Sequence, residues 1–188
     1  MKKVLGIFLL AACTVVPAPA PQADTRTLAA AVDRAITEGH PDQAQKALLE
    51  LLGRPHVELE VLLACGAKLA ERERFEPARA VFARAVQEYP RSFEAHYNLA
   101  LADIALRRFD EARAALEAPV EASKDQQAAR EYLRGKIHEA AGEPALAERC
   151  FTAAFSAAPE EENYALDLGM FYLRQPIRPR HARFWQPE

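Results

Sequence analysis

The chain has 188 residues, half of them apolar, which is enough to bury a sizeable hydrophobic core. Its formal net charge of −3 argues against nucleic acid as the main partner, because binding to phosphates needs clustered Lys and Arg. Its three cysteines are too few for a disulfide scaffold and lack the CxxC or Cys/His spacing of a metal site.

The first twelve residues have the pattern of an export signal. Lys2 and Lys3 precede an apolar run, residues 4–12, that is too short to span a bilayer as a permanent helix. The run ends in Leu-Ala-Ala directly before Cys13, which resembles the lipobox of bacterial lipoproteins. The resemblance implies that residues 1–12 are a lipoprotein signal peptide and that Cys13 carries lipid. The alternative is an ordinary secretory signal followed by a chance cysteine.

Residues 13–24 form the lipidated cysteine and a tether rich in Pro and Ala. The repeated Ala-Pro steps disfavour a helix and favour an extended chain that spans roughly 30 Å. Residue 14 is a threonine, whereas an aspartate there favours retention in the inner membrane of enteric lipoproteins. The resemblance therefore implies a lipid anchor in the outer membrane of a Gram-negative bacterium, with the protein facing the periplasm.

A helix-turn-helix unit is best defined in residues 59–90. Gly66 stands at its position 8, where the missing side chain lets a partner helix approach closely, and Ala78 at position 20 sits at the same crossing. Phe82 at position 24 fills the space behind the crossing, and Pro90 at position 32 ends the second helix. This spacing resembles the tetratricopeptide repeat (TPR), whose period is about 34 residues.

The same unit recurs along residues 25–174. Repeats are expected to start at residues 25, 59, 93 and 128, and a lone helix follows from residue 162. Position 20 is alanine in all four complete units, at Ala44, Ala78, Ala112 and Ala147. The resemblance predicts an all-α fold, a right-handed TPR α-solenoid of four helix-turn-helix repeats with a C-terminal capping helix. The alternative is a generic bundle of amphipathic helices.

Several positions predict local features of this array. Pro119 lies inside a second helix, which is expected to end near residues 117–118 and to lead into a loose connection through residue 126. Glu76 and Arg79 are expected to face solvent. The lone helix is apolar on all sides, so a cover is expected, and the nearest is the Pro/Arg/aromatic tail, residues 175–188.

The sequence contains no recognisable catalytic or metal-binding arrangement. HExxH, GxSxG and Walker-type motifs are absent, and the five histidines are scattered. We therefore expect no enzyme activity, no cofactor, no metal and no small-molecule substrate. His138 and Asp103 share position 11 of adjacent repeats and are candidates for a buried polar pair that serves packing rather than function.

Protein binding is the function that the TPR resemblance implies. In TPR proteins the first helices line a concave groove, and the matching positions here form an apolar strip with two tyrosines. The predicted groove consists of Leu63, Tyr97, Asn98, Leu101, Ile104, Tyr132, Lys136, Leu166 and Met170. The simpler explanation is that Leu101 and Ile104 pack within the array. A competing apolar patch is Phe171, Phe184 and Trp185 at the C-terminal end.

These features together predict a membrane-anchored protein–protein interaction scaffold that binds or localises an envelope protein or a peptide segment of one. The chain is similar in plan to the small TPR lipoproteins that act as pilotins or assembly factors of type IV pili. The alternative is an adaptor for a peptidoglycan-modifying enzyme.

Overall fold

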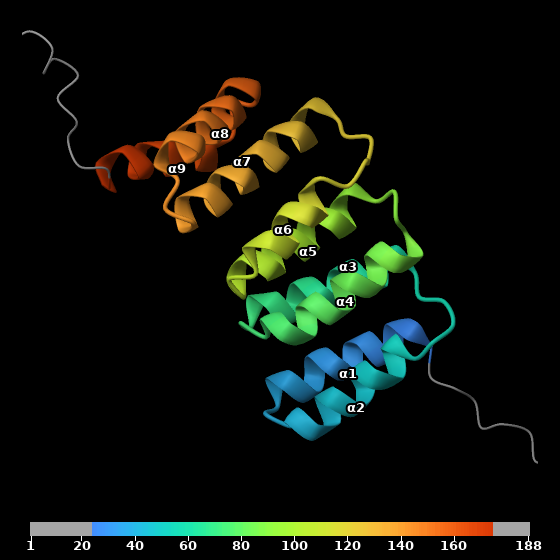
Figure 1. The fold of residues 1–188 in the computed structure, drawn as a ribbon. Coiled ribbons are helices and arrows are strands. Elements are labelled where there is room, and N and C mark those ends of the chain that lie inside the picture. The colour runs from blue at the N-terminus through green and yellow to red at the C-terminus, as the bar shows by residue number, and fades with distance from the viewer. Residues whose placement is uncertain (1–23, 175–188) are drawn as a thin grey trace, which may run out of the picture.

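The computed structural model describes residues 24–174, which form nine α-helices and no β-strand (Figure 1). The helices are α1 (Thr25–Thr37), α2 (Pro41–Leu52), α3 (Leu59–Glu71), α4 (Phe75–Glu88), α5 (Phe93–Ala105), α6 (Phe109–Leu116), α7 (Lys124–Ala140), α8 (Pro144–Ala157) and α9 (Glu162–Arg174). The helices pack as consecutive pairs from α1–α2 to α7–α8, and α9 packs on α8 at the end of the array.

Most first helices begin where the sequence pattern places a repeat. Helices begin at Thr25, Leu59, Phe93 and Glu162, but α7 begins at Lys124, four residues before the expected start at 128. A capping box at Ser123 explains the difference: its hydroxyl accepts the Gln126 N–H, and the Gln126 side chain accepts the Ser123 N–H. The connection after α6 therefore covers residues 117–123 and does not extend through residue 126.

Positions 8 and 24 meet inside the repeats. A Cβ added to Gly66 would lie only 2.6 Å from Cζ of Phe82, and one added to Gly135 would lie 2.6 Å from Cδ1 of Phe151. The third repeat fills the same two positions with Ala100 and Leu116, both buried. A larger residue at position 8 thus accompanies a smaller one at position 24, so the volume at the helix crossing is balanced between them.

The turn inside each repeat needs a left-handed residue at position 15. Gly39 and Gly142 both have φ of 75°, whereas the same position is occupied by Glu73 with φ of 58° and by Arg107 with φ of 59°. Glycine adopts this conformation freely, but an L side chain destabilises it by roughly 1–2 kcal/mol. Two of the four turns are therefore strained.

Buried apolar side chains form three clusters along the array. The first joins α1 to α5 and includes Leu51, Leu62 and Phe82. The second lies between α5, α6 and α7, and the third holds α8 and α9 together through Phe151 and Phe171. The core thus runs as a series of local contacts between neighbouring repeats, as a solenoid requires.

Candidate protein-binding site

Residues of the predicted concave groove are engaged with one another. The Tyr132 hydroxyl donates a hydrogen bond to the carboxylate of Asp167 on α9, and Nζ of Lys136 lies 3.1 Å from the same carboxylate. The Tyr132 ring also stacks on Tyr164, with 4.9 Å between the ring centroids. Burial and the Asp167 carboxylate raise the pKa of Tyr132. The polar tips of Tyr132 and Lys136 therefore hold α9 on the array.

Tyr97 and Asn98 on α5 are also committed to contacts within the array. Tyr97 stacks on Phe93 with 5.7 Å between the ring centroids, and burial raises the pKa of Tyr97 to about 12. The Asn98 amide donates to the carbonyl oxygen of Glu94 at 2.8 Å. This bond ties one N–H of the amide to its own helix.

The other predicted groove residues divide into two groups. Leu63 and Ile104 are half-buried and pack against the first and second core clusters, whereas Leu101, Leu166 and Met170 are exposed. The exposed members lie mainly on α9. Of the predicted groove residues, the exposed apolar ones are therefore Leu101 on α5 and Leu166 and Met170 on α9.

Phe171 is not part of an exposed patch. It is only 1% exposed and packs against Phe151, with 5.5 Å between the ring centroids. This corrects the expectation that Phe171 forms a surface patch with Phe184 and Trp185, both of which lie outside the described residues. Phe171 points inward because α9 uses this face to pack on α8.

The buried charge in the core has a different partner from the expected one. Asp103 is 1% exposed and accepts a hydrogen bond from Nε of Arg79 on α4. His138 instead lies with Nδ1 2.6 Å from the carboxylate of Glu143. Arg79 therefore does not simply face solvent, and the proposed His138–Asp103 pair is absent. Burial raises the pKa of Asp103, and the Arg79 guanidinium opposes that rise.

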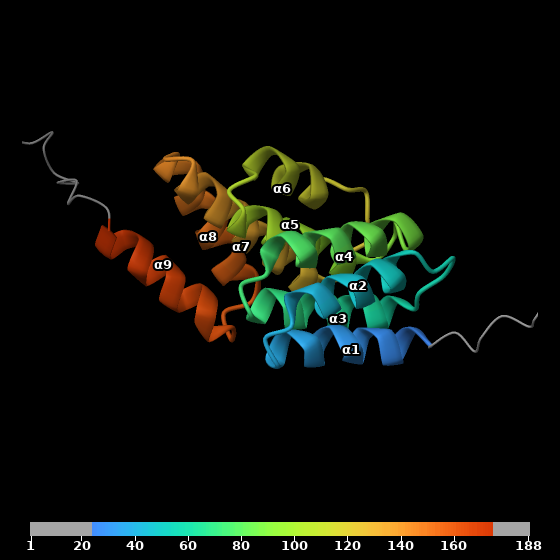
Figure 2. The same ribbon diagram turned by 90° about the horizontal axis from the view of Figure 1, so that it is seen from below.

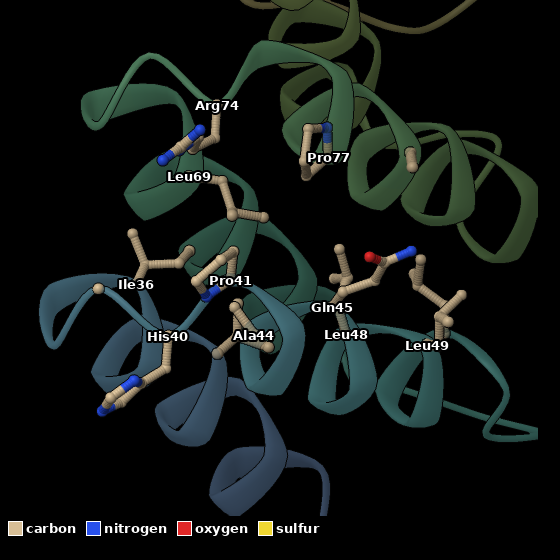
Figure 3. Close-up of a pocket in the computed structure, with 14 residues that line it drawn as sticks. Ile36, His40, Pro41, Ala44, Gln45, Leu48, Leu49, Leu69, Arg74 and Pro77 are labelled. Carbon is tan, nitrogen blue, oxygen red and sulfur yellow. The ribbon is translucent and has the colours of Figure 1, made fainter.

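An apolar groove that the sequence analysis missed lies between α2 and α4 (Figure 3). Its volume is about 660 Å³, and Leu49 on the α2 wall is 62% exposed. The lining residues are Val32, Ile36, Gly39, His40, Pro41, Ala44, Gln45, Leu48, Leu49, Leu52, Leu69, Arg74, Pro77 and Ala80. We refer to these residues as the α2–α4 groove.

The groove lies where the first two repeats join. Both α2 and α3 pack on α1, and α1 and α3 run side by side (Figure 2). The connection between α2 and α3, residues 53–58, is longer than residues 89–92 between α4 and α5. Arg84 on α4 fixes this longer connection, because its guanidinium donates to the carbonyl oxygens of Leu52 at 3.3 Å and of Arg54 at 2.9 Å.

Polar groups stand at one end of the groove. Figure 3 places Arg74 and His40 at the end that also carries Ile36, away from Leu49. Within residues 24–174, the Arg74 side chain has no carboxylate or other hydrogen-bond partner. The groove thus combines apolar walls with one uncompensated cation at its end. Four leucines in the twelve residues of α2 are the sequence signal that indicates this surface, since one helix face does not need them all.

Residues 24–174 offer no alternative site with metal or thiol chemistry. In this part of the chain no group of three His, Cys, Asp or Glu side chains is placed to hold a metal ion. Burial raises the pKa of Cys65 to about 11, so its thiol remains protonated and serves packing. None of the described helices is long and apolar enough to cross a membrane.

Family models of the tetratricopeptide repeat match residues 69–137 and 132–183. With the nine helices of the described region, these matches establish the chain as an all-α solenoid of tetratricopeptide repeats, a class that provides extended surfaces for protein–protein interaction.

Solved structures of MamA share this fold. MamA from Desulfovibrio magneticus RS-1, residues 41 to the end, is 24% identical with a TM-score of 0.58, over 82% of this chain and 87% of that one. A crystal structure titled MamA protein is 23% identical with a TM-score of 0.59, over 79% of this chain and 81% of that one. No curated protein matches the sequence closely. Identities this low show a common fold alone.

Proposed function

We propose that this protein is a membrane-anchored scaffold, without catalytic activity of its own, that binds a segment of an envelope protein in the α2–α4 groove. The observation that carries the proposal is the exposure of Leu49 beside Leu48 and Leu52 in an apolar groove of about 660 Å³. Covering the exposed part of Leu49 would favour binding, since burial of apolar surface contributes roughly 25 cal/mol per Å².

A short amphipathic helix fits the dimensions of the groove. The α2 wall runs through Ala44, Leu48 and Leu52, a spacing that follows one helix face. The twelve residues of α2 are about 18 Å long, which matches about three turns of a bound helix laid alongside. An acidic residue on the occupant would pair with Arg74 at the end of the groove.

The lipid anchor and the localisation are proposed from the sequence pattern at the N-terminus. Lipid on Cys13 would hold the scaffold on the outer membrane, facing the periplasm, where its partner is an envelope protein. We propose further that the protein is a component of secretion or pilus assembly, because its plan is similar to that of pilotins. Residues 1–23 lie outside the described part of the chain.

Photo-crosslinking in the full-length protein tests the groove directly. Benzoylphenylalanine at position 49 is expected to form one defined adduct in cells, whereas the same group at Thr152 forms none. Thr152 is the matched control because it is exposed and also stands at position 25 of its repeat. An equal yield from both positions, or none from position 49, contradicts the proposal.

Two further variants separate the candidate surfaces. Arg74→Glu is expected to weaken the adduct, while Arg91→Glu, another exposed arginine, leaves it unchanged. Tyr97→Ala combined with Tyr132→Ala tests the predicted concave groove. If that double variant abolishes capture and Arg74→Glu does not, the concave groove is the binding site instead.

A further inference from the structure

The two helices that form the walls of the α2–α4 groove begin at the same end of it. His40 precedes α2 and Arg74 precedes α4, and both residues lie at the end of the groove away from Leu49 (Figure 3). Each of these helices packs on the first helix of its own repeat, α2 on α1 and α4 on α3. The groove is therefore bounded by two helices that run in the same direction.

Both helices have a partial positive charge at this end, because the first N–H groups of a helix have no partner within it. The residues before α2 and α4, His40 and Arg74, donate or accept no side-chain hydrogen bond with the first turn of their helix. The starts of α5 and α7 differ, since Ser92 and Ser123 cap them. Two helix N-termini without a side-chain cap thus lie at the end of the groove that carries Arg74.

The formal charges at the two ends of the groove are also unequal. Arg74 is the only Lys, Arg, Asp or Glu among the residues that line it. The acidic residues in the first turns of the two walls, Asp42 and Glu76, do not line the groove, and Glu76 pairs with Arg108 at 2.9 Å. The end at Arg74 therefore favours a negative group, whereas the end at Leu49 is apolar.

We propose that the segment bound in the groove is a helix that runs antiparallel to α2 and α4, with an acidic side chain in its last turn beside Arg74. In this direction the partially negative C-terminal end of the bound helix lies next to two N-termini and a guanidinium. A parallel helix would bring a third positive end to the same place. The inference rests on the proposed function, because it specifies how the same groove is filled.

This direction defines the chemistry of the partner. The helix dipole disfavours acidic side chains in the last turn of an isolated helix and favours them in the first. A segment with an acidic last turn is therefore a weak helix on its own, and the charges at the Arg74 end stabilise it when it binds. Its apolar residues recur at intervals of three and four, so that one face covers Ala44, Leu48 and Leu52.

Cross-linking from both ends of the groove tests the direction. Benzoylphenylalanine is placed in the full-length protein at position 40 or at position 49, and mass spectrometry locates the attachment site in each adduct. The two positions are nine residues apart, about 14 Å along a helix. Position 40 is therefore expected to attach about nine residues C-terminal to the site reached from position 49, in the same segment of the partner. The matched control is Glu143, which is exposed and stands at position 16 of its repeat as His40 does.

An exchange of charges tests the contact with Arg74. Arg74→Glu is expected to lower the yield of the adduct from position 49 several-fold. Lysine in place of the acidic residue in the last turn of the captured segment is expected to restore that yield in the Arg74→Glu protein and to lower it in the unsubstituted protein. Circular dichroism of each variant confirms that its helices are intact.

The outcomes separate this inference from the proposed function. If position 40 attaches on the N-terminal side of the site reached from position 49, the antiparallel direction is wrong although the groove still binds the segment. An adduct from position 49 alone, or a charge exchange that restores nothing, also overturns the inference. If position 49 gives no adduct, the proposed function itself fails and the inference fails with it.

Discussion

Replacing Gly66 with alanine puts a methyl group against the ring of Phe82. The added Cβ would lie 2.6 Å from Cζ and 2.8 Å from Cδ1, whereas carbon atoms in favourable contact are about 3.5–4.0 Å apart. Phe82 is 2% exposed, so its ring has no free space to enter. Overpacking of this kind destabilises a core by about 1–3 kcal/mol, and the better helix propensity of alanine offsets about 1 kcal/mol of that.

A double-mutant cycle isolates the steric contribution. Phe82→Leu alone removes volume from a buried site and is also expected to destabilise the protein. The double variant recreates the Ala100–Leu116 arrangement of the third repeat, so it is expected to be more stable than the two single changes predict. The helix propensity of alanine cancels in the cycle, which leaves a coupling energy of about 1–3 kcal/mol.

Urea unfolding of the four proteins, followed by circular dichroism, measures that coupling. One kcal/mol corresponds to about 2–4 °C in melting temperature for a domain of this size, so thermal melts give an independent check. If the two changes add within about 0.5 kcal/mol, the ring does not occupy the space above Gly66. The account of positions 8 and 24 is then wrong.

Three other changes have defined outcomes. Glu73→Gly relieves a left-handed turn at a side chain without a partner in the described region, and is expected to raise the melting temperature by the equivalent of up to about 1 kcal/mol. Arg79→Leu leaves the buried Asp103 carboxylate unpaired and is expected to destabilise by about 2 kcal/mol at pH 7, discounted from 3–5 because Arg79 is 30% exposed, whereas Glu76→Leu has little effect. Burial raises the pKa of Asp103, so protonation neutralises this carboxylate as the pH falls. The excess cost of Arg79→Leu over Glu76→Leu should therefore shrink as the pH is lowered from 7, and a constant difference in urea titrations refutes this. Cys13→Ala is expected to move the protein from the membrane fraction to the soluble periplasm, and equal retention of both forms removes the lipid anchor from the proposal.

The helices were predictable because a few residue types have well-defined effects on the backbone close to them. Gly66 and Phe82 pack on each other as their spacing indicates, and α6 ends at Leu116, shortly before Pro119. The early start of α7 was also readable, because Ser123 followed three residues later by Gln126 is the pattern of a capping box. These features depend on residues close together in the chain, where the rules of backbone geometry apply directly.

The binding surface depends instead on contacts between repeats. Tyr132 stands at the expected position, but Asp167, thirty-five residues later, accepts its hydroxyl hydrogen bond. Near the α2–α4 groove, Arg84 donates hydrogen bonds to the carbonyl oxygens of Leu52 and Arg54. A period of 34 residues says which side chains face a neighbouring helix, but not how far apart successive helix pairs stand. Hydrogen bonds to backbone carbonyls leave no pattern in a sequence.

The division of the core into three clusters makes stability uneven along the chain. The cluster between α1 and α5 contains many large side chains, whereas the cluster of α8 and α9 rests on Ala147, Phe151 and Phe171. In such an array each unit opens with its own free energy, so amide hydrogens of α8 and α9 should exchange with solvent sooner than those of α3 and α4. The walls of the α2–α4 groove belong to the slower unit. A bound segment would therefore stay in place while the other end of the molecule opens and closes.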